Sequence, residues 1–302
     1  MLYKRSIGEK IFNIFNIIFL TIIALLVIYP FVNVIAISLN EGMDTIKHPG
    51  LIFPSKFTLE NYRVALSYPL MKQAAFVSFS RTILATAIHL IVCTLAAYAF
   101  SKKDLPFRKM FLLVLLVPLF LNPGIIPGYL NMRNLKMLDT FWVYLFPGAF
   151  AFFDFLIIRT FVEGIPDSLE ESAIIDGASY LQVFVKIIIP LSKPVLAAIG
   201  LFCAVGVWND WFTTMLYTNS PKIYTLQYLL QKILQENLQQ EMISYTSQGK
   251  DLANAKASGL VAVTSTSVRM ATLMISTLPI MLIYPFIQKY FEQGMMIGAI
   301  KG

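Results

Sequence analysis

The sequence has little charge and few of the side chains that bind metals or form disulfides. Only 14% of its 302 residues are charged, whereas 57% are hydrophobic, and the mean hydropathy is +0.68. A soluble globule could not cover so much apolar surface, so that class is excluded. The two histidines and two cysteines show no metal-ligand spacing and no disulfide framework. With no acidic cluster and no nucleophile motif beside them, they also argue against a membrane-embedded enzyme.

Basic residues are in excess, and the net charge is +7. They are scattered between apolar runs rather than gathered in a stripe with interleaved aromatic side chains. This distribution argues against a nucleic-acid partner, and membrane topology accounts for the charge more simply.

Long apolar runs dominate the sequence. Windows of about 18 or more apolar residues recur, and a helix of this length crosses about 30 Å of hydrocarbon. We therefore predict an all-α, multi-pass membrane protein in which residues 1–302 form one transmembrane domain. Its six spans are predicted at residues 11–38, 73–100, 109–130, 140–161, 195–217 and 269–289.

An even number of spans places both termini on one side of the membrane. Lys and Arg divide evenly between the two sides over the whole chain, so the short segments decide, because cytoplasmic loops are enriched in these residues. The first ten residues contain three basic side chains, and "SKKDLPFRK" contains four in nine. Both termini are therefore predicted to be cytoplasmic. Residues 39–72 and the longer segment 218–268 are predicted to be external, the latter either a docking surface or a mobile loop.

One segment with acidic residues, a glycine and two prolines interrupts the apolar sequence. It reads "EESAIIDGASYLQVFVKIIIPLSKP" and covers residues 170–194. Ser168 and Glu171 have the spacing of a capping box, which predicts a helix from near Leu169 to about Asp176. Gly177 then permits a sharp turn or a close backbone contact.

A second, amphipathic helix is predicted from about Ser179. Its apolar face follows the i, i+3, i+4, i+7 spacing and consists of Leu181, Phe184, Val185 and Ile188. Pro190 and Pro194 are expected to end the helix. Such a helix usually lies in the lipid headgroups. Acidic residues in the preceding helix favour a protein partner with a basic cleft instead.

This segment closely resembles the EAA loop, E-A-A-x-x-D-G-A-x(5)-F-x-x-I-x-x-P-x-x-x-P, of permease subunits of binding-protein-dependent ABC importers. The matching residues are Glu171, Ser172, Ala173, Asp176, Gly177, Ala178, Phe184, Ile187, Pro190 and Pro194. Ser172 replaces the first alanine, but as a small residue it should still fit a helix contact. "WNDWF" at 208–212 and "PFIQKYFEQGMMIGAIKG" at 285–302 resemble the carbohydrate-uptake branch typified by the maltose transporter's smaller permease. "RSIGEKIFNIFN" and "FTLENYRVAL" resemble its subgroup for complex oligosaccharides.

The resemblance implies a type I ABC importer permease fold with six transmembrane helices and a cytoplasmic coupling-helix (EAA) loop at about 163–194. It implies a plasma-membrane permease that works with a second homologous permease, two cytoplasmic ATPase subunits and an extracellular solute-binding protein to import an oligosaccharide. In this family the loop enters a cleft on an ATPase, whose closure opens the pathway outward. The ATPase-coupling residues would be Glu171, Ser172, Ala173, Asp176, Gly177, Ala178, Phe184 and Pro190. The 298–302 tail would also reach the ATPases.

Nucleotide binding is expected to lie outside this chain. No Walker motif, G-x-x-x-x-G-K-[ST], occurs in the sequence. We therefore expect no cofactor here, with ATP and Mg bound by the partner ATPases, and a transport subunit rather than an enzyme.

A few polar side chains are predicted at membrane depth, where ionisable groups are expensive and usually functional. Asp154 is placed near the middle of the fourth span, either in an interhelical hydrogen bond or in contact with substrate. His89 is expected to be a satisfied helix contact, and Arg81 to snorkel toward the interface. A candidate sugar contact, alternatively interfacial packing, is the cluster Trp208, Asn209, Asp210 and Trp211. Asp154 also motivates an alternative function, an ion-coupled secondary transporter.

Overall fold

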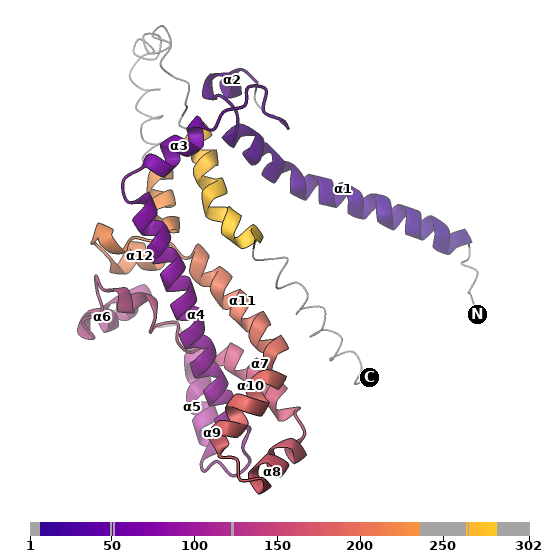
Figure 1. Ribbon diagram of the computed structural model, residues 1–302, viewed down its shortest axis with the longest axis vertical. Helices are drawn as coiled ribbons and strands as arrows, with labels where there is room; N and C mark the ends of the chain where they lie inside the picture. Colours follow the sequence, from indigo (N-terminus) through magenta and orange to yellow (C-terminus); the bar gives the residue numbers. More distant parts are fainter. Residues whose placement is uncertain are drawn as a thin grey trace. The chain divides into compact units, whose positions relative to one another are not determined.

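The computed structural model describes residues 7–48, 50, 52–121, 124–235, 264 and 266–282 (Figure 1). These residues are largely helical, and their only β-type pairing is an isolated bridge between Asn40 and Phe57. The chain divides into two compact units, residues 1–69 with 232–277 and residues 70–231 with 278–302.

The first unit begins with α1 (Ile7–Ser38), whose 32 mostly apolar residues make it about 48 Å long. Almost all of its side chains are exposed until the last turn, and Pro30 lies inside it. Two short helices follow, α2 (Gly42–Lys47) and α3 (Glu60–Ser67). A continuous apolar surface on a helix of this length suits a lipid-facing span.

Two buried asparagines join the end of α1 to α2 and α3. The Asn61 amide donates to the carbonyls of Ser38 (3.0 Å) and Asn40 (2.8 Å). These carbonyls at the end of α1 therefore have hydrogen-bond donors outside the helix. The Asn40 amide donates to the Asp44 carboxylate at 3.0 Å, and this hydrogen bond lowers the pKa of Asp44. The loop after α1 is therefore a hydrogen-bonded cap.

The second unit is built around α4 (Met71–Ser101), which packs against α7 (Phe152–Glu163) and α11 (Lys193–Asn209) (Figure 1). Small residues on α4, Cys93 and Ala97, are fully buried and share a core with Phe155 and Ile158 of α7. Small side chains let helix backbones approach closely where no water drives them together. The second unit also contains α5 (Arg108–Phe120), α6 (Ile125–Asn134), α12 (Phe212–Tyr217) and the 3₁₀ turns η1 (Phe141–Tyr144) and η3 (Pro221–Ile223).

Among the described residues, two single helices, α1 and α4, are long and apolar enough to cross a membrane, and the number rises to four if two bent pairs each form one span. The region of the predicted fourth span holds η1 and then α7, which begins only at Phe152, beyond Pro147 and Gly148. In the region of the sixth, a helix covers Thr266–Leu282. Residues 283–289, most of the predicted external segment 218–268 and the tail 298–302 lie outside the described residues. The six-span count thus stays a prediction.

Candidate functional site

The first helix of the EAA-like segment is α8 (Asp167–Ile175). Its N-cap is Pro166, without any side-chain cap, so the predicted Ser168–Glu171 capping box was wrong, whereas the helix begins within two residues of the predicted start near Leu169. Asp167 and Glu170 occupy the first turn, where negative charge is favourable beside the helix dipole. Glu171 lies one residue further on with its side chain exposed.

The motif residues at the end of α8 form a Schellman turn. The amide of Ala178 donates to the carbonyl of Ala173 at 2.9 Å, and the amide of Gly177 donates to Ile174 at 2.9 Å. Asp176 is the C-cap, and Gly177 has φ +86°, a left-handed conformation that favours glycine. Ala173, Gly177 and Ala178, which match the EAA pattern, therefore form the turn that ends this helix.

The second helix begins where it was predicted, with Ser179 as its N-cap. The hydroxyl of Ser179 accepts from the amide of Gln182 at 3.3 Å, and the Gln182 side chain accepts from the amide of Ser179 at 2.8 Å. This reciprocal pair is a capping box.

Beyond its first turn the second helix differs from the prediction. It runs as α9 (Tyr180–Val183), a π-helical turn η2 (Phe184–Ile188) and α10 (Ile189–Leu191), then bends by 78° into α11. The wide turn directly precedes Pro190, whose ring would crowd the carbonyl four residues earlier in a regular helix. Pro190 therefore does not end the helix, and Pro194 lies in the first turn of α11.

The π turn also changes which face is buried. Val183, Phe184 and Ile188 are buried, whereas Leu181 is 67% and Val185 51% exposed. The predicted apolar face was therefore only half right, because it assumed a constant 3.6-residue repeat through Pro190.

α8 is tied to the end of α4 by a polar and aromatic contact. The Tyr98 hydroxyl donates to the Glu170 carboxylate at 3.1 Å, and Lys102 forms an ion pair with the same carboxylate. The Lys102 ammonium also lies 4.4 Å from the centre of the Tyr98 ring, and Phe184 packs on that ring at 5.3 Å. These four side chains fix both helices of the segment to α4.

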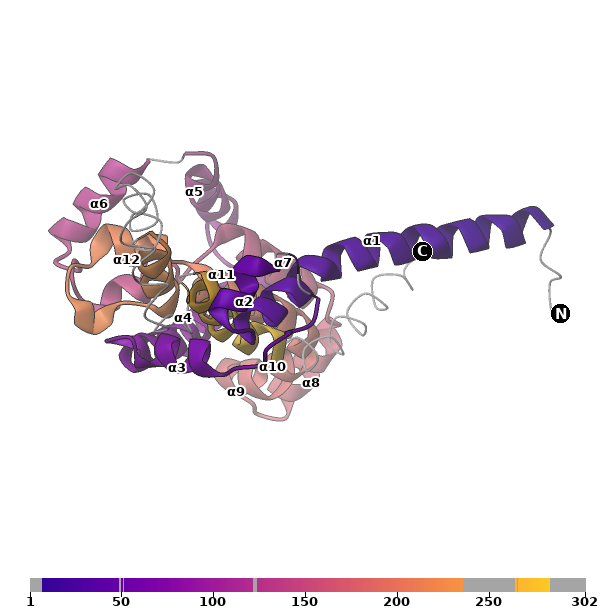
Figure 2. The ribbon, with the colours of Figure 1, turned by 90° about the horizontal axis from the view of Figure 1, so that it is seen from above.

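The opposite face of the segment is open. α8 and α9 lie side by side at one end of the second unit (Figures 1 and 2). Ile175 is 85% exposed, and the side chains of Glu171 and Ser172 are also exposed. A recess of about 430 Å³ lies beside the turn and is lined by Ala173, Asp176, Gly177, Ala178, Gln182, Val183, Lys186 and Ile187. A carboxylate next to exposed apolar side chains is suited to docking a protein.

Asp154 is paired with His89. It lies in the first turn of α7 rather than mid-helix, and its carboxylate is 2.9 Å from Nε2 of His89 on α4. The other ring nitrogen of His89 is 3.0 Å from the carbonyl of Gly148. Each ring nitrogen of His89 therefore lies within hydrogen-bonding distance of an oxygen atom. His89 is a satisfied helix contact, as predicted.

Asp210 is paired with Arg81, eight residues before His89 on α4. Arg81 is only 4% exposed, so the prediction that it snorkels was wrong. Its guanidinium forms an ion pair with the Asp210 carboxylate, donates to the Asp210 carbonyl at 2.9 Å, and lies 4.6 Å from the centre of the Tyr144 ring. Asp210 also accepts from the amide of Thr213 at 3.1 Å, so it fixes the start of α12.

The other members of the tryptophan cluster point to packing. Trp208 is buried with its ring edge-on to Phe79 at 5.0 Å, and Trp211 packs on Phe212. The exposed Asn209 amide donates to the carbonyl of Val205 at 3.0 Å. Asp154 and Asp210 bind positions on α4 that are about 12 Å apart along the helix axis, so the structure does not gather the candidate pathway residues into one site.

Tyr144, Tyr98 and Lys102 were missed as polar partners by the sequence reasoning. An ionisable residue in an apolar run needs a partner, but that signal does not say that Asp210 is the partner of Arg81. Tyr144 gives no such signal in sequence, because tyrosine is common at membrane interfaces. In the described part of the chain, no three His, Cys, Asp or Glu side chains come close enough to hold a metal ion.

Long apolar helices, buried polar contacts between them and a helix–glycine turn–helix at one end define a membrane transport component. The chain belongs to the family described as the binding-protein-dependent transport system inner membrane component, which matches residues 2–297. This confirms the resemblance noted in the sequence and the all-α permease fold. Members are permease subunits and not catalysts.

Named relatives and a solved structure agree. The chain is 35% identical to Protein LplC of Bacillus subtilis, over 97% of this chain and 96% of the relative. It is 34% identical to the polygalacturonan/rhamnogalacturonan transport system permease protein YtcP of the same organism, over 97% and 99%. A chain in the crystal structure of a bacterial ABC transporter involved in the import of the acidic polysaccharide alginate matches with a TM-score of 0.83 and 30% identity, over 95% of this chain and 99% of that chain.

Proposed function

We propose that this chain is the permease subunit of an ABC importer for an oligosaccharide, and that residues 163–194 couple it to partner ATPases. The observation that carries this proposal is the local geometry of the EAA-like segment. Its motif residues build a rigid helix–turn–helix that is fixed to α4 on one side and exposed on the other. A rigid, exposed element is what a force-transmitting contact requires.

The substrate and the partners follow from the family and its relatives. Relatives that transport polygalacturonan, rhamnogalacturonan and alginate support an oligosaccharide as the substrate. We infer a second homologous permease, two cytoplasmic ATPases that hold ATP and Mg, and an external solute-binding protein, docked in part by residues 218–268. The chain would lie in the plasma membrane with six spans and both termini in the cytoplasm.

The EAA-like segment at residues 163–194, from here on the coupling segment, would act through α4. The 31 residues of α4 extend over about 46 Å. Near its end Tyr98 and Lys102 hold Glu170 of α8, further along His89 holds Asp154, and near its start Arg81 holds Asp210. A displacement of α8 would therefore be passed to α7 and α11 through polar contacts that resist sliding.

Glu171 is the residue we assign to charge-assisted hydrogen bonding with a basic residue on the ATPase. Its side chain is exposed and forms no ion pair with another described residue. A hydrogen bond to a charged group contributes about 1.5–3 kcal/mol, so its loss should weaken ATPase binding by roughly 10- to 100-fold.

The alternative function, an ion-coupled secondary transporter that uses Asp154, loses its support. The family is that of binding-protein-dependent systems, and Asp154 is already hydrogen-bonded to His89 between α4 and α7.

The test is co-purification of the affinity-tagged chain with its co-expressed partners, comparing wild type with Glu171→Ala and Gly177→Asp. The matched control is Glu60→Ala, an exposed acid in α3, whose pair with Arg63 is solvent-exposed. ATPase should be recovered with wild type and control and reduced in the two variants. Equal recovery with all four proteins would refute the coupling assignment.

A further inference from the structure

A second cleft in the second unit lies beside the start of α5. It has a volume of about 620 Å³. Half of its lining residues are basic, namely Lys103, Arg108, Lys109 and Arg159, and the other half are apolar, namely Leu105, Phe107, Met110 and Leu112. No carboxylate lines it.

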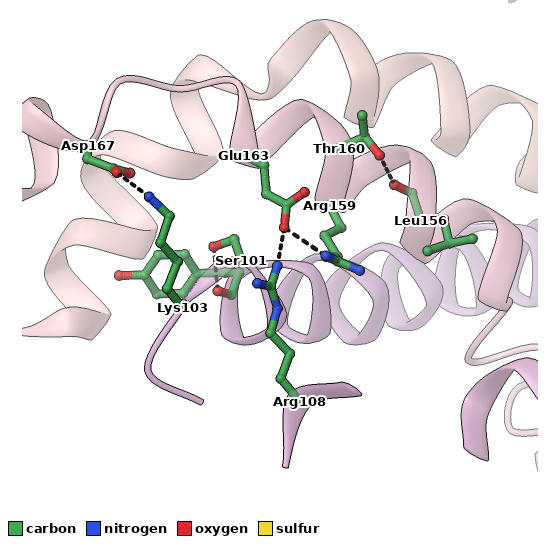
Figure 3. A network of polar contacts seen from close by, with 9 residues as sticks. Ser101, Lys103, Arg108, Leu156, Arg159, Thr160, Glu163 and Asp167 are labelled. Carbon is green, nitrogen blue, oxygen red and sulfur yellow. Dashed lines mark hydrogen bonds and ion pairs between the residues drawn. The ribbon is translucent and has the colours of Figure 1, made fainter. Parts of the chain in front are cut away.

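The basic side chains of this cleft are not fully neutralised. Figure 3 shows Glu163 accepting from both Arg108 and Arg159, with Arg159 Nε at 3.0 Å. Lys103 reaches Asp167 at 3.3 Å in a pair that is open to solvent (Figure 3). Three of the four cations thus share two carboxylates, and Lys109 has no ion-pair partner among the described residues.

Two further features favour an anion at this place. The Nε–H of Arg108 is buried, with no acceptor in the part of the chain that the structure describes. α5 has no side-chain cap, and Arg108 and Lys109 occupy its first turn, where the helix dipole disfavours positive charge. An anion bound here would reverse an unfavourable local field.

The apolar half of the cleft shows what kind of anion fits. α5 continues as "MFLLVLLVPLF" with most of its large side chains exposed, which is the surface of a helix that meets lipid. Phe107, with φ +56° and 72% exposed, stands at the boundary between this surface and the charged loop. Basic pockets that adjoin lipid-facing helices bind anionic headgroups, because the acyl chains are already at the correct depth.

We propose that this cleft is a binding site for an anionic phospholipid. The phosphate lies among Lys103, Arg108, Lys109 and Arg159, and the acyl chains lie along Met110 and Leu112. The proposed topology puts the site in the inner leaflet, but the chemistry does not depend on the leaflet. The positive-inside rule alone accounts for basic side chains in water; it does not account for a buried, unpartnered guanidinium N–H beside an apolar wall.

The test is native mass spectrometry of the purified importer complex after incubation with phosphatidylglycerol or phosphatidylcholine. The variant is Lys103→Gln with Lys109→Gln, since both side chains are exposed and their loss leaves the fold intact. The control is Lys193→Gln, an exposed lysine of α11 that does not line the cleft. Glu163→Gln removes the carboxylate that pairs with Arg108 and Arg159, so this variant should bind the lipid more tightly.

We expect each lost lysine to weaken phosphatidylglycerol binding about fivefold, with no change in the control, tighter binding in Glu163→Gln, and no dependence on the cleft for phosphatidylcholine. Equal retention by wild type and the double variant would overturn the proposal. So would release of the lipid by inorganic phosphate, which would point to a free-anion site. Loss of a partner ATPase from the double variant, with lipid binding unchanged, would instead make the cleft a protein interface.

Discussion

At the residue scale, the coupling segment depends on one backbone conformation and on a few buried charges. Gly177 has φ +86°, and a Cβ built there would meet no atom within 4 Å. The constraint at this position is therefore the backbone conformation and not a lack of space. Arg81 and Asp210 are constrained differently, because each would be left partly or fully buried without its partner.

Substitution of Gly177 should separate conformation from size. Gly177→Val should destabilise the turn by about 1–3 kcal/mol, because a β-branched residue is strained at positive φ. Gly177→Asn should cost much less, because asparagine tolerates the left-handed region. Thermal unfolding of the purified complex and ATP-driven uptake both report the difference. Equal losses with Val and Asn would mean that the left-handed turn is not what matters.

Breaking the Arg81–Asp210 pair should be severe. Arg81→Met alone should lower the free energy of unfolding by about 3–5 kcal/mol, because it leaves a carboxylate uncompensated. The double variant Arg81→Met with Asp210→Leu should recover most of that loss. Denaturation of the detergent-solubilised protein compares the single variants Arg81→Met and Asp210→Leu with the double variant. Losses that simply add would show that the two side chains do not stabilise each other.

Much of this residue-level picture could be predicted from the sequence. The EAA-like spacing gave the positions of Gly177 and the small residues, since a glycine between small residues after a helix is a local signal. The partners of Asp154 and Arg81 were not predictable, because they lie 65 and 129 residues away. Tertiary pairing of this kind leaves no trace in local pattern.

At the element scale, the two helices of the coupling segment begin by different means. α8 starts after Pro166 with no side-chain cap, whereas α9 starts with the Ser179–Gln182 capping box. Both serines fit a cap by sequence, but only Ser179 has the extended backbone of a capping residue, at φ −73° and ψ 158°. The π turn before Pro190 was also beyond sequence reasoning, because periodicity assumes regular helix.

The two serines therefore make a matched pair of variants. Ser179→Ala should destabilise the start of α9 by about 1 kcal/mol, because it removes the side-chain acceptor. Ser168→Ala should have almost no effect, since Ser168 lies inside α8 and caps nothing. The rate of amide hydrogen exchange over residues 180–184 measures the stability of the start of α9 directly. Faster exchange in Ser168→Ala than in Ser179→Ala would contradict the assignment of the caps.

At the scale of the whole molecule, the second unit connects an exposed coupling segment to polar contacts along α4. The hydropathy pattern predicted the all-α membrane class and placed α1 and α4 within a few residues of their observed ends. It did not predict the break between α5 and α6 or the late start of α7, where prolines interrupt apolar runs without changing their hydropathy. Composition reports burial in lipid, and it does not report where a helix breaks.

We propose that ATP hydrolysis by partner subunits drives transport through this chain. The most direct measurement is uptake of a labelled oligosaccharide into proteoliposomes that contain the permease pair and the ATPases, with the solute-binding protein supplied outside and ATP inside. We predict that uptake requires ATP, persists when ionophores dissipate proton and sodium gradients, and falls roughly 10-fold or more in Glu171→Ala. Uptake that proceeds without ATP and collapses with an ion gradient would contradict the account.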